Sequence, residues 1–291
     1  MKSVFKGEQA KASMLQWFDR FRERIPAPTE SRTVSTRFGD THVLVAGPEN
    51  GPSLVVLHGA LANSAIALVE MAPLLKHFRV YSVDVIGQSV KSADMRPSVS
   101  NNDYGLWLQD VLDGLSLQKP HVVGVSWGGF VAIRLAACAP ERINRLALLV
   151  PAGMVNGPAW AGITRMAIPM MLYLRSPSEH RLKAFLKNLL TTWDDNWSTY
   201  MGEALRAYDT RITMPALARP HELKNFSSPT LVLGADGDLN FPGEKVLARA
   251  AELFPSLTDK ELLRDCNHCP PTTDEFRGWV SNRISQFLLA S

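Results

Sequence analysis

Apolar and polar positions form two kinds of block along most of the chain. Short runs rich in Val and Leu, typical of buried strands, alternate with longer segments whose apolar residues recur at helical spacing. After a hairpin at 33–38 and 41–46, joined at Gly39-Asp40, the expected strands are 53–58, 78–84, 121–125, 144–150, 229–233 and 257–263. The expected helices are 64–76, 103–116, 129–139, 243–254 and 273–289. Because most strand runs are continuously apolar, we predict an α/β fold with a mostly parallel eight-stranded sheet flanked by helices.

This alternation is interrupted once. Residues 154–222 contain no convincing strand, yet they hold six of the ten Met and three of the seven Trp. We predict that they form a helical cap inserted into a core of residues 29–153 and 223–291. Because Met fills irregular apolar pockets, the cap predicts an apolar substrate group, and simple packing of the cap onto the core is the alternative. If the cap contacts substrate, shrinking Trp160, Trp193 or Met170 is expected to change the preferred chain length.

The first 28 residues have a pattern of their own. Apolar residues recur near helical spacing over residues 10–25, and Pro26 and Pro28 end the segment. We expect an amphipathic helix packed on the protein's own body or on a partner. The basic residues along it leave a membrane-surface role as the alternative.

The strongest candidate for a catalytic motif lies where the strand 121–125 meets the helix that follows. The chain there reads Gly124-Val125-Ser126-Trp127-Gly128, and a Gly-x-Ser-x-Gly turn between a strand and a helix is typical of a nucleophile elbow. Small residues two before and two after the serine let the strand and the helix approach closely. Ser126 is therefore the predicted catalytic nucleophile.

A serine nucleophile needs a histidine base, and the histidine needs a carboxylate to orient it. His268 follows the strand 257–263, and ligands of open α/β sheets sit at the carboxyl ends of strands. The loop after the strand 229–233 offers two acids, Asp238 and Asp236, of which we favour Asp238. Asp236 is the alternative, and the one not used is expected to form the turn.

An acyl-transfer site also needs two backbone N–H groups that stabilise the oxyanion. One is expected from Trp127, directly after the nucleophile. The other is expected from Ala60 in the loop after the strand 53–58, with Leu61 as the alternative. His58 is expected to brace this loop by hydrogen bonds.

These segments together resemble the α/β-hydrolase family, in particular serine carboxylesterases with a helical cap. The segments that carry the resemblance are LHGAL (57–61), VDVIGQS (83–89), GVSWGG (124–129), GADGDLNFP (234–242) and CNHCP (266–270). The family's triad corresponds to Ser126, Asp238 and His268, and its oxyanion hole to Ala60 and Trp127. Two departures stand out, since Ser89 replaces a usual glycine and Asn267 replaces the usual glycine before the histidine. The acid loop is also one residue longer than is common.

Composition limits the other possibilities. The formal net charge of +3 and the absence of a long basic run give no indication of nucleic-acid binding. Three cysteines are an odd, sparse set, no signal-peptide pattern opens the chain and no apolar run spans a bilayer, so a cytoplasmic protein without stable membrane insertion is expected. Cys266 and Cys269 flank His268, but zinc ligation there would remove the base. We therefore expect neither a metal nor another cofactor, while the sequence leaves the oligomeric state open.

The sequence thus predicts a serine hydrolase that cleaves a carboxylic ester or a similar acyl bond of a small molecule through an acyl-enzyme on Ser126. A carbon–carbon bond hydrolase or a perhydrolase would use the same residues. A ligand-binding signalling protein with the same fold and slow turnover is the alternative from another class.

Overall fold

The computed structural model describes residues 3–210 and 214–290. The remaining positions, 1–2, 211–213 and 291, lie within the predicted N-terminal segment, cap and core but outside the described residues. The strands are β1 (Thr29–Thr36), β2 (Gly39–Ala46), β3 (Ser53–Leu57), β4 (Arg79–Val83), β5 (His121–Val125), β6 (Leu146–Leu149), β7 (Thr230–Ala235) and β8 (Leu257–Leu263). The α-helices outside residues 154–222 are α1 (Glu8–Arg22), α2 (Ser64–Glu70), α3 (Asp103–Gly114), α4 (Trp127–Cys138), α9 (Gly243–Leu253) and α10 (Asp274–Leu288).

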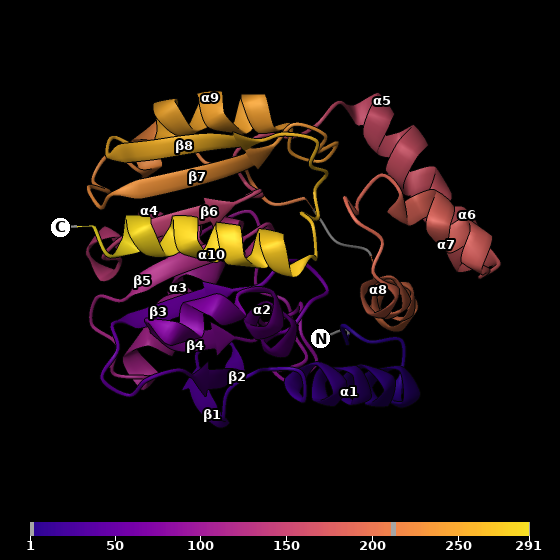
Figure 1. Ribbon diagram of the computed structural model, residues 1–291, viewed down its shortest axis with the longest axis horizontal. Helices are drawn as coiled ribbons and strands as arrows, with labels where there is room; N and C mark the ends of the chain where they lie inside the picture. Colours follow the sequence, from indigo (N-terminus) through magenta and orange to yellow (C-terminus); the bar gives the residue numbers. More distant parts are fainter. Residues whose placement is uncertain (1–2, 211–213, 291) are drawn as a thin grey trace.

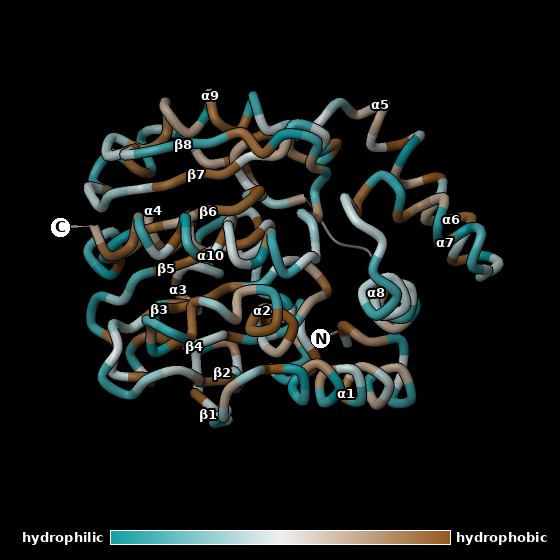
Figure 2. The backbone as a smooth tube through the Cα atoms, viewed as in Figure 1, coloured by the Kyte–Doolittle hydropathy of each residue, from teal (hydrophilic) through white to brown (hydrophobic). Residues whose placement is uncertain are grey.

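The eight strands form a single sheet in the order β1-β2-β4-β3-β5-β6-β7-β8 (Figure 1). The pairs β1–β2 and β2–β4 are antiparallel, and all the others are parallel. Apolar residues from α2 and α10 cover one face of the sheet, and those from α3, α4 and α9 cover the other. Figure 2 shows β6 and β7 as largely hydrophobic, as strands buried on both faces must be. The predicted fold class and the mostly parallel eight-stranded sheet are therefore confirmed.

Several predicted boundaries differ from the structure, and three of the differences have a local cause. The first strand begins at Thr29, and the hairpin turns at Arg37-Phe38, so that Gly39, with φ of 108°, opens the second strand. The helix expected over 64–76 ends at Glu70, and a 3₁₀ turn (Ala72–Lys76) follows, because Pro73 cannot donate the N–H that a continuing helix needs. The N-terminal helix stops at Arg22 rather than Ile25, since the residue before Pro26 is disfavoured in helical conformation.

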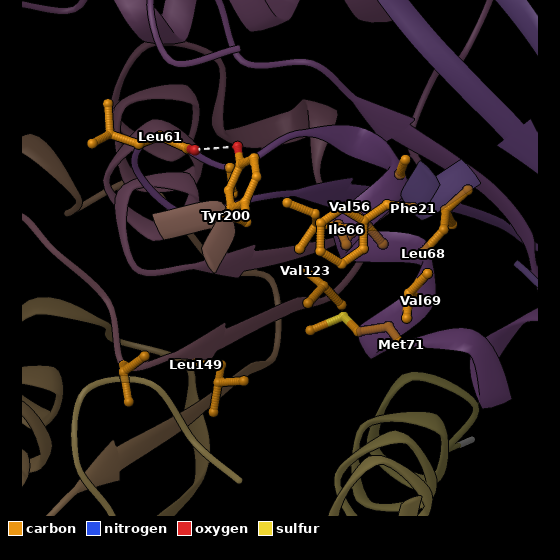
Figure 3. Packing of buried hydrophobic residues seen from close by; sticks show 14 of the residues in the cluster. Phe21, Val56, Leu61, Ile66, Leu68, Val69, Met71, Val123, Leu149 and Tyr200 are labelled. Atoms are coloured by element: carbon orange, nitrogen blue, oxygen red, sulfur yellow. Dashed lines mark hydrogen bonds between the residues drawn. The ribbon is translucent and has the colours of Figure 1, made fainter. Parts of the chain in front are cut away.

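Helix α1 packs on the body of the protein between α2 and the cap helix α8 (Asp195–Ala207) (Figure 1). Its apolar side chains Met14, Trp17, Phe18 and Phe21 are buried. Figure 3 shows Phe21 close to Tyr200 of α8, whose hydroxyl donates a hydrogen bond to the carbonyl oxygen of Leu61. The apolar face of α1 is thus used inside the molecule.

The described part of residues 154–222 contains helices and two isolated bridges but no strand. Its helices are α5 (Ala159–Ala161), a π-helical turn (Gly162–Ala167), α6 (Ile168–Arg175), α7 (Glu179–Leu186), α8 and a 3₁₀ turn (Pro220–Glu222). In Figure 1, α5, α6 and α7 stand away from the sheet at the right-hand edge. This segment thus adds a layer beside the carboxyl ends of the parallel strands.

Candidate active site

Ser126 sits in a sharp turn between β5 and α4. Its backbone has φ of 50° and ψ of −111°, a conformation that non-glycine residues rarely adopt. The turn is also tightly packed, since a Cβ atom on Gly128 would lie 2.1 Å from the carbonyl oxygen of Leu57. A Cβ atom on Gly124 would lie 2.7 Å from the carbonyl oxygen of Gly128. The strained backbone and the two glycines hold the serine at the carboxyl end of the central strand.

His268 comes from the loop after β8, and its imidazole reaches Ser126. The distance from its Nε2 atom to Ser126 Oγ is 2.9 Å, which is hydrogen-bonding distance. The ring also packs edge-on against Phe241, with 5.3 Å between the ring centroids. The structure therefore brings the predicted nucleophile and base into direct contact.

The two acids of the loop after β7 have different partners. Asp238 is buried, its Oδ2 lies 2.7 Å from His268 Nδ1, and its Oδ1 accepts the N–H groups of Asn240 and Phe241 at 2.8 and 3.0 Å. Asp236 instead accepts the N–H groups of Cys266 and Asp265, both at 3.1 Å, and these bonds lower the pKa of its carboxyl group. Asp238 thus contacts the imidazole, while Asp236 braces the loop that carries it.

The loop after β3 lies beside Ser126, since a Cβ atom on Gly59 would be 3.5 Å from Ser126 Cβ. His58 is buried, which lowers its pKa, and its neutral ring bridges the carbonyl oxygen of Gly59 at 2.7 Å and the N–H of Val85 at 2.9 Å. The N–H of Leu61 donates to Gln88 Oε1 at 3.3 Å. Within the described residues, the N–H groups of Ala60 and Trp127 have no protein acceptor, and both residues line the same cavity as Ser126. Of the two candidate oxyanion donors, Ala60 thus has an N–H group without a protein acceptor in the described structure, whereas the N–H group of Leu61 is already bonded to Gln88.

The cavity above Ser126 has a volume of about 370 Å³ and is lined mostly by apolar side chains. Its floor comes from the sheet and α2, and its other side comes from α7, α8 and the residues between them. The cap contributes Phe185, Leu189, Leu190, Trp197, Met201 and Leu205, together with Met214 and Pro215. The expectation that Trp160, Trp193 and Met170 reach substrate is wrong for this structure, because none of them lines the cavity. Helical spacing alone could not tell which side of each cap helix turns inward.

An ion pair in the cavity wall was not predicted from the sequence. Arg277 of α10 donates from Nε and Nη2 to the two carboxylate oxygens of Glu70, at 3.0 and 2.9 Å, and Trp197 Nε1 donates to the same carboxylate at 2.9 Å. The three side chains therefore join α2, α10 and the cap helix α8. Arg277 and Trp197 lie 207 and 127 residues from Glu70 along the chain, so no local motif could have revealed the cluster.

The histidine loop is also tied to the cap. The side-chain amide of Asn267 donates to the carbonyl oxygen of Leu190, and its backbone N–H donates to Thr191 Oγ1, each at 2.9 Å. The backbone carbonyl oxygen of Cys269 accepts a hydrogen bond from the N–H of Thr191 at 3.0 Å, and the N–H of Cys269 donates to the carbonyl oxygen of Leu189 at 2.8 Å. Asn267, which departs from the family's usual glycine, thus helps to fix the position of His268.

The two cysteines beside His268 carry weakly acidic thiols, and Cys269 lines the cavity that contains Ser126. Burial raises the pKa of Cys266 to about 11 and that of Cys269 to about 12, so both are protonated at neutral pH. Both ring nitrogens of His268 already face Ser126 and Asp238. No cluster of three or more metal-ligating side chains occurs among residues 3–210 and 214–290. In the same ranges, no helix has the length and apolar character that crossing a membrane requires.

The fold and this geometry agree with the comparison to known families. Residues 52–207, more than half of the chain, match the family described as alpha/beta hydrolase fold, and the chain belongs to that family. It is similar to carboxylesterase YbfK of Bacillus subtilis (strain 168), with 28% identity over 284 residues that cover 94% of this chain and 92% of that protein. It is also similar to the uncharacterized carboxylesterase nap of the same organism, with 38% identity over 141 residues, or 47% of each chain.

Solved structures show the same fold over nearly the whole chain. Naproxen esterase (carboxylesterase NP) from Bacillus subtilis superimposes with a TM-score of 0.82 at 24% identity, covering 97% of this chain and 99% of that one. Carboxylesterase CesB (YbfK) from Bacillus subtilis superimposes with a TM-score of 0.80 at 24% identity, covering 98% and 100%. The extent of these superpositions indicates that the cap layer also has counterparts in those structures.

Proposed function

We propose that this protein hydrolyses carboxylic esters of small molecules through an acyl-enzyme on Ser126. The observation that carries the proposal is the unbroken series of contacts from Ser126 Oγ to His268, at 2.9 Å, and from His268 to Asp238, at 2.7 Å, beside an apolar cavity. The similarity to proteins named carboxylesterases supports the same activity.

In this mechanism Ser126 Oγ attacks the ester carbonyl carbon while His268 Nε2 takes its proton. Asp238, held by two backbone N–H groups, orients the ring and stabilises the imidazolium that forms. The N–H groups of Ala60 and Trp127 stabilise the oxyanion. Collapse of the intermediate breaks the bond to the alcohol, which leaves with the proton from His268. Water then attacks the acyl-enzyme through the same histidine, releasing the acid and restoring Ser126.

We further assign the chemistry to a core of residues 29–153 and 223–291, and substrate choice to the cap of residues 154–222. The support is the composition of the cavity wall, since the cap contributes mostly apolar side chains to it. Apolar contacts there would favour an ester with an apolar acyl or alcohol group, because each methylene removed from water contributes about 0.8 kcal/mol.

The direct test is turnover of a series of p-nitrophenyl esters from acetate to dodecanoate. Multiple turnovers, lost on Ser126→Ala but kept in a control with Ser100→Ala on the exposed surface, are the expected result. Removal of a serine nucleophile costs up to about 10⁶-fold in kcat in a related mechanism. Release of a single equivalent of p-nitrophenol without further turnover would instead support the ligand-binding alternative.

A further inference from the structure

The cap carries a surface that the proposed hydrolysis does not use. Ten large apolar side chains are exposed among the described residues, and five of them lie within the seventeen residues of α5, the π turn and α6. These five form what we term the outer face: Trp160 (76% exposed), Ile163 (50%), Ile168 (41%), Met171 (60%) and Leu172 (50%). Single exposed apolar residues are ordinary, but a concentration of this kind marks an interaction surface.

The backbone helps to align these side chains. In a regular α-helix, Ile163 and Ile168 would point in clearly different directions, because they are five residues apart. The π turn at Gly162–Ala167 has hydrogen bonds that run five residues back, which brings positions five apart closer to one line. The outer face therefore continues from Trp160 of α5 to Leu172 of α6, a length of about 18 Å at about 1.5 Å per residue.

The outer face is not needed for packing. The opposite side of the same segment already packs against a buried apolar cluster that includes α7 and α8, through buried Tyr173 and the partly buried Met166, Met170 and Leu174. In Figure 1 this segment lies at the edge of the molecule, away from the sheet. The outer face is also separate from the substrate cavity, since none of its five residues lines that cavity.

The charges around the outer face indicate what it contacts. Between residues 159 and 190 the basic side chains are Arg165, Arg175, Arg181, Lys183 and Lys187, and the only acidic one is Glu179. Glu179 pairs with Lys183, whereas Arg165, Arg175 and Lys187 are exposed and form no ion pair within the described residues. An apolar face bordered by unpaired cations is typical of helices that lie in the headgroup region of anionic membranes. A symmetric contact between two copies would bring these like charges together.

We propose that the outer face docks this protein onto the surface of an anionic lipid bilayer. Trp160, Met171 and their neighbours enter the boundary between headgroups and acyl chains, and the exposed cations contact lipid phosphates. Docking is peripheral and places the cap beside a phase in which apolar esters accumulate. The proposal depends on the surface alone and holds whether or not Ser126 is a nucleophile.

The test is flotation of Ser126→Ala protein with vesicles of phosphatidylglycerol mixed equally with phosphatidylcholine, and with vesicles of phosphatidylcholine alone. We expect binding to the anionic vesicles that weakens as salt is added. The double variant Met171→Ser with Leu172→Ser should bind at least about tenfold more weakly. The double variant Arg165→Gln with Arg175→Gln should lose about fivefold for each cation, or about 25-fold.

Matched controls lie elsewhere on the surface. Leu289, at 48% exposure, resembles Leu172 and follows α10 at the opposite edge of the molecule, so Leu289→Ser should bind like the parent protein. Lys245→Gln with Lys260→Gln removes two exposed cations outside the cap segment and should have little effect. An unchanged melting temperature for every variant shows that each is folded.

Three results would overturn the proposal. The first is no binding to anionic vesicles, and the second is equal loss of binding in the cap variants and the controls. The third is a dimer in sedimentation that Met171→Ser with Leu172→Ser disrupts, because a second copy would then occupy the outer face. Absence of ester turnover by the wild-type protein would contradict the proposed function and would leave the docking result unaffected.

Discussion

Asp238→Asn is the substitution that most sharply tests which of the two acids in the loop after β7 orients His268. Asn keeps the oxygen that accepts the N–H groups of Asn240 and Phe241, so the loop is expected to hold its shape. The new amide nitrogen, however, faces His268 Nδ1 at the 2.7 Å separation now occupied by a carboxylate oxygen. Two donors cannot face each other at that distance, so the imidazole shifts its proton to Nε2. His268 then donates to Ser126 and can no longer take its proton.

The expected loss of kcat follows from this change of tautomer. The same substitution in the triad of serine proteases lowers kcat by roughly 10⁴-fold, which corresponds to about 5 kcal/mol of transition-state stabilisation. Asp236→Asn is the matched control, because Asp236 contacts the N–H groups of Asp265 and Cys266 but not the imidazole. Losing one such hydrogen bond costs about 1 kcal/mol of stability, and activity should fall less than about tenfold.

The assay is kcat for a p-nitrophenyl ester, measured for both variants beside their melting temperatures. We expect a folded Asp238→Asn protein with very low kcat and an active Asp236→Asn protein with a slightly lower melting temperature. The reverse order of the two kcat values would refute the assignment of Asp238, as would an Asp238→Asn protein that kept most of its activity.

The remaining predictions concern the cap, the histidine loop and acid stability. Met201→Ala, which enlarges the cavity, should change the chain-length profile of kcat/KM by about fourfold per methylene, whereas Trp193→Ala, outside the cavity, should leave the profile flat. Asn267→Gly removes the hydrogen bond to Leu190 and should lower kcat about fivefold with little change in KM, and recovery of kcat in Asn267→Gln would support a positioning role. Burial lowers the pKa of His121 from 6.5 to about 4, so between these pH values the unfolded chain binds the proton more readily than the folded one. The free energy of unfolding should therefore decrease as the pH is lowered from 6.5 to about 4. His121→Phe should reduce this pH dependence in urea denaturation, and an unchanged pH dependence would contradict the prediction.

Much of the fold could be predicted because the strands carry a direct signal. Continuous apolar runs such as Leu146–Leu149 are buried on both faces, and that burial specifies a parallel sheet with helices on each side. The Ser126 turn was similarly visible, since only small residues at 124 and 128 permit such a close approach of strand and helix. Chain order then limited the candidates for the base, because a parallel sheet gathers the loops after its strands at one edge.

Other features depend on contacts that local patterns do not encode. Asp236 and Asp238 lie two residues apart in one loop, and only the folded loop directs one toward His268 and the other toward Cys266. The inward side of the cap was also hidden, because Met and Trp occur on both sides of its helices. Pairs distant in sequence, such as Glu70 with Arg277, had no signal in the chain at all.

The most direct test of the account is to trap the acyl group on the enzyme. Wild-type protein is mixed with an excess of a p-nitrophenyl ester, quenched in acid within the first turnover, and mapped by peptide mass spectrometry. The account predicts a burst of one equivalent of p-nitrophenol and the acyl mass on the peptide that contains Ser126, with neither in Ser126→Ala. Turnover with no acyl adduct, or an adduct on a residue other than Ser126, would contradict it.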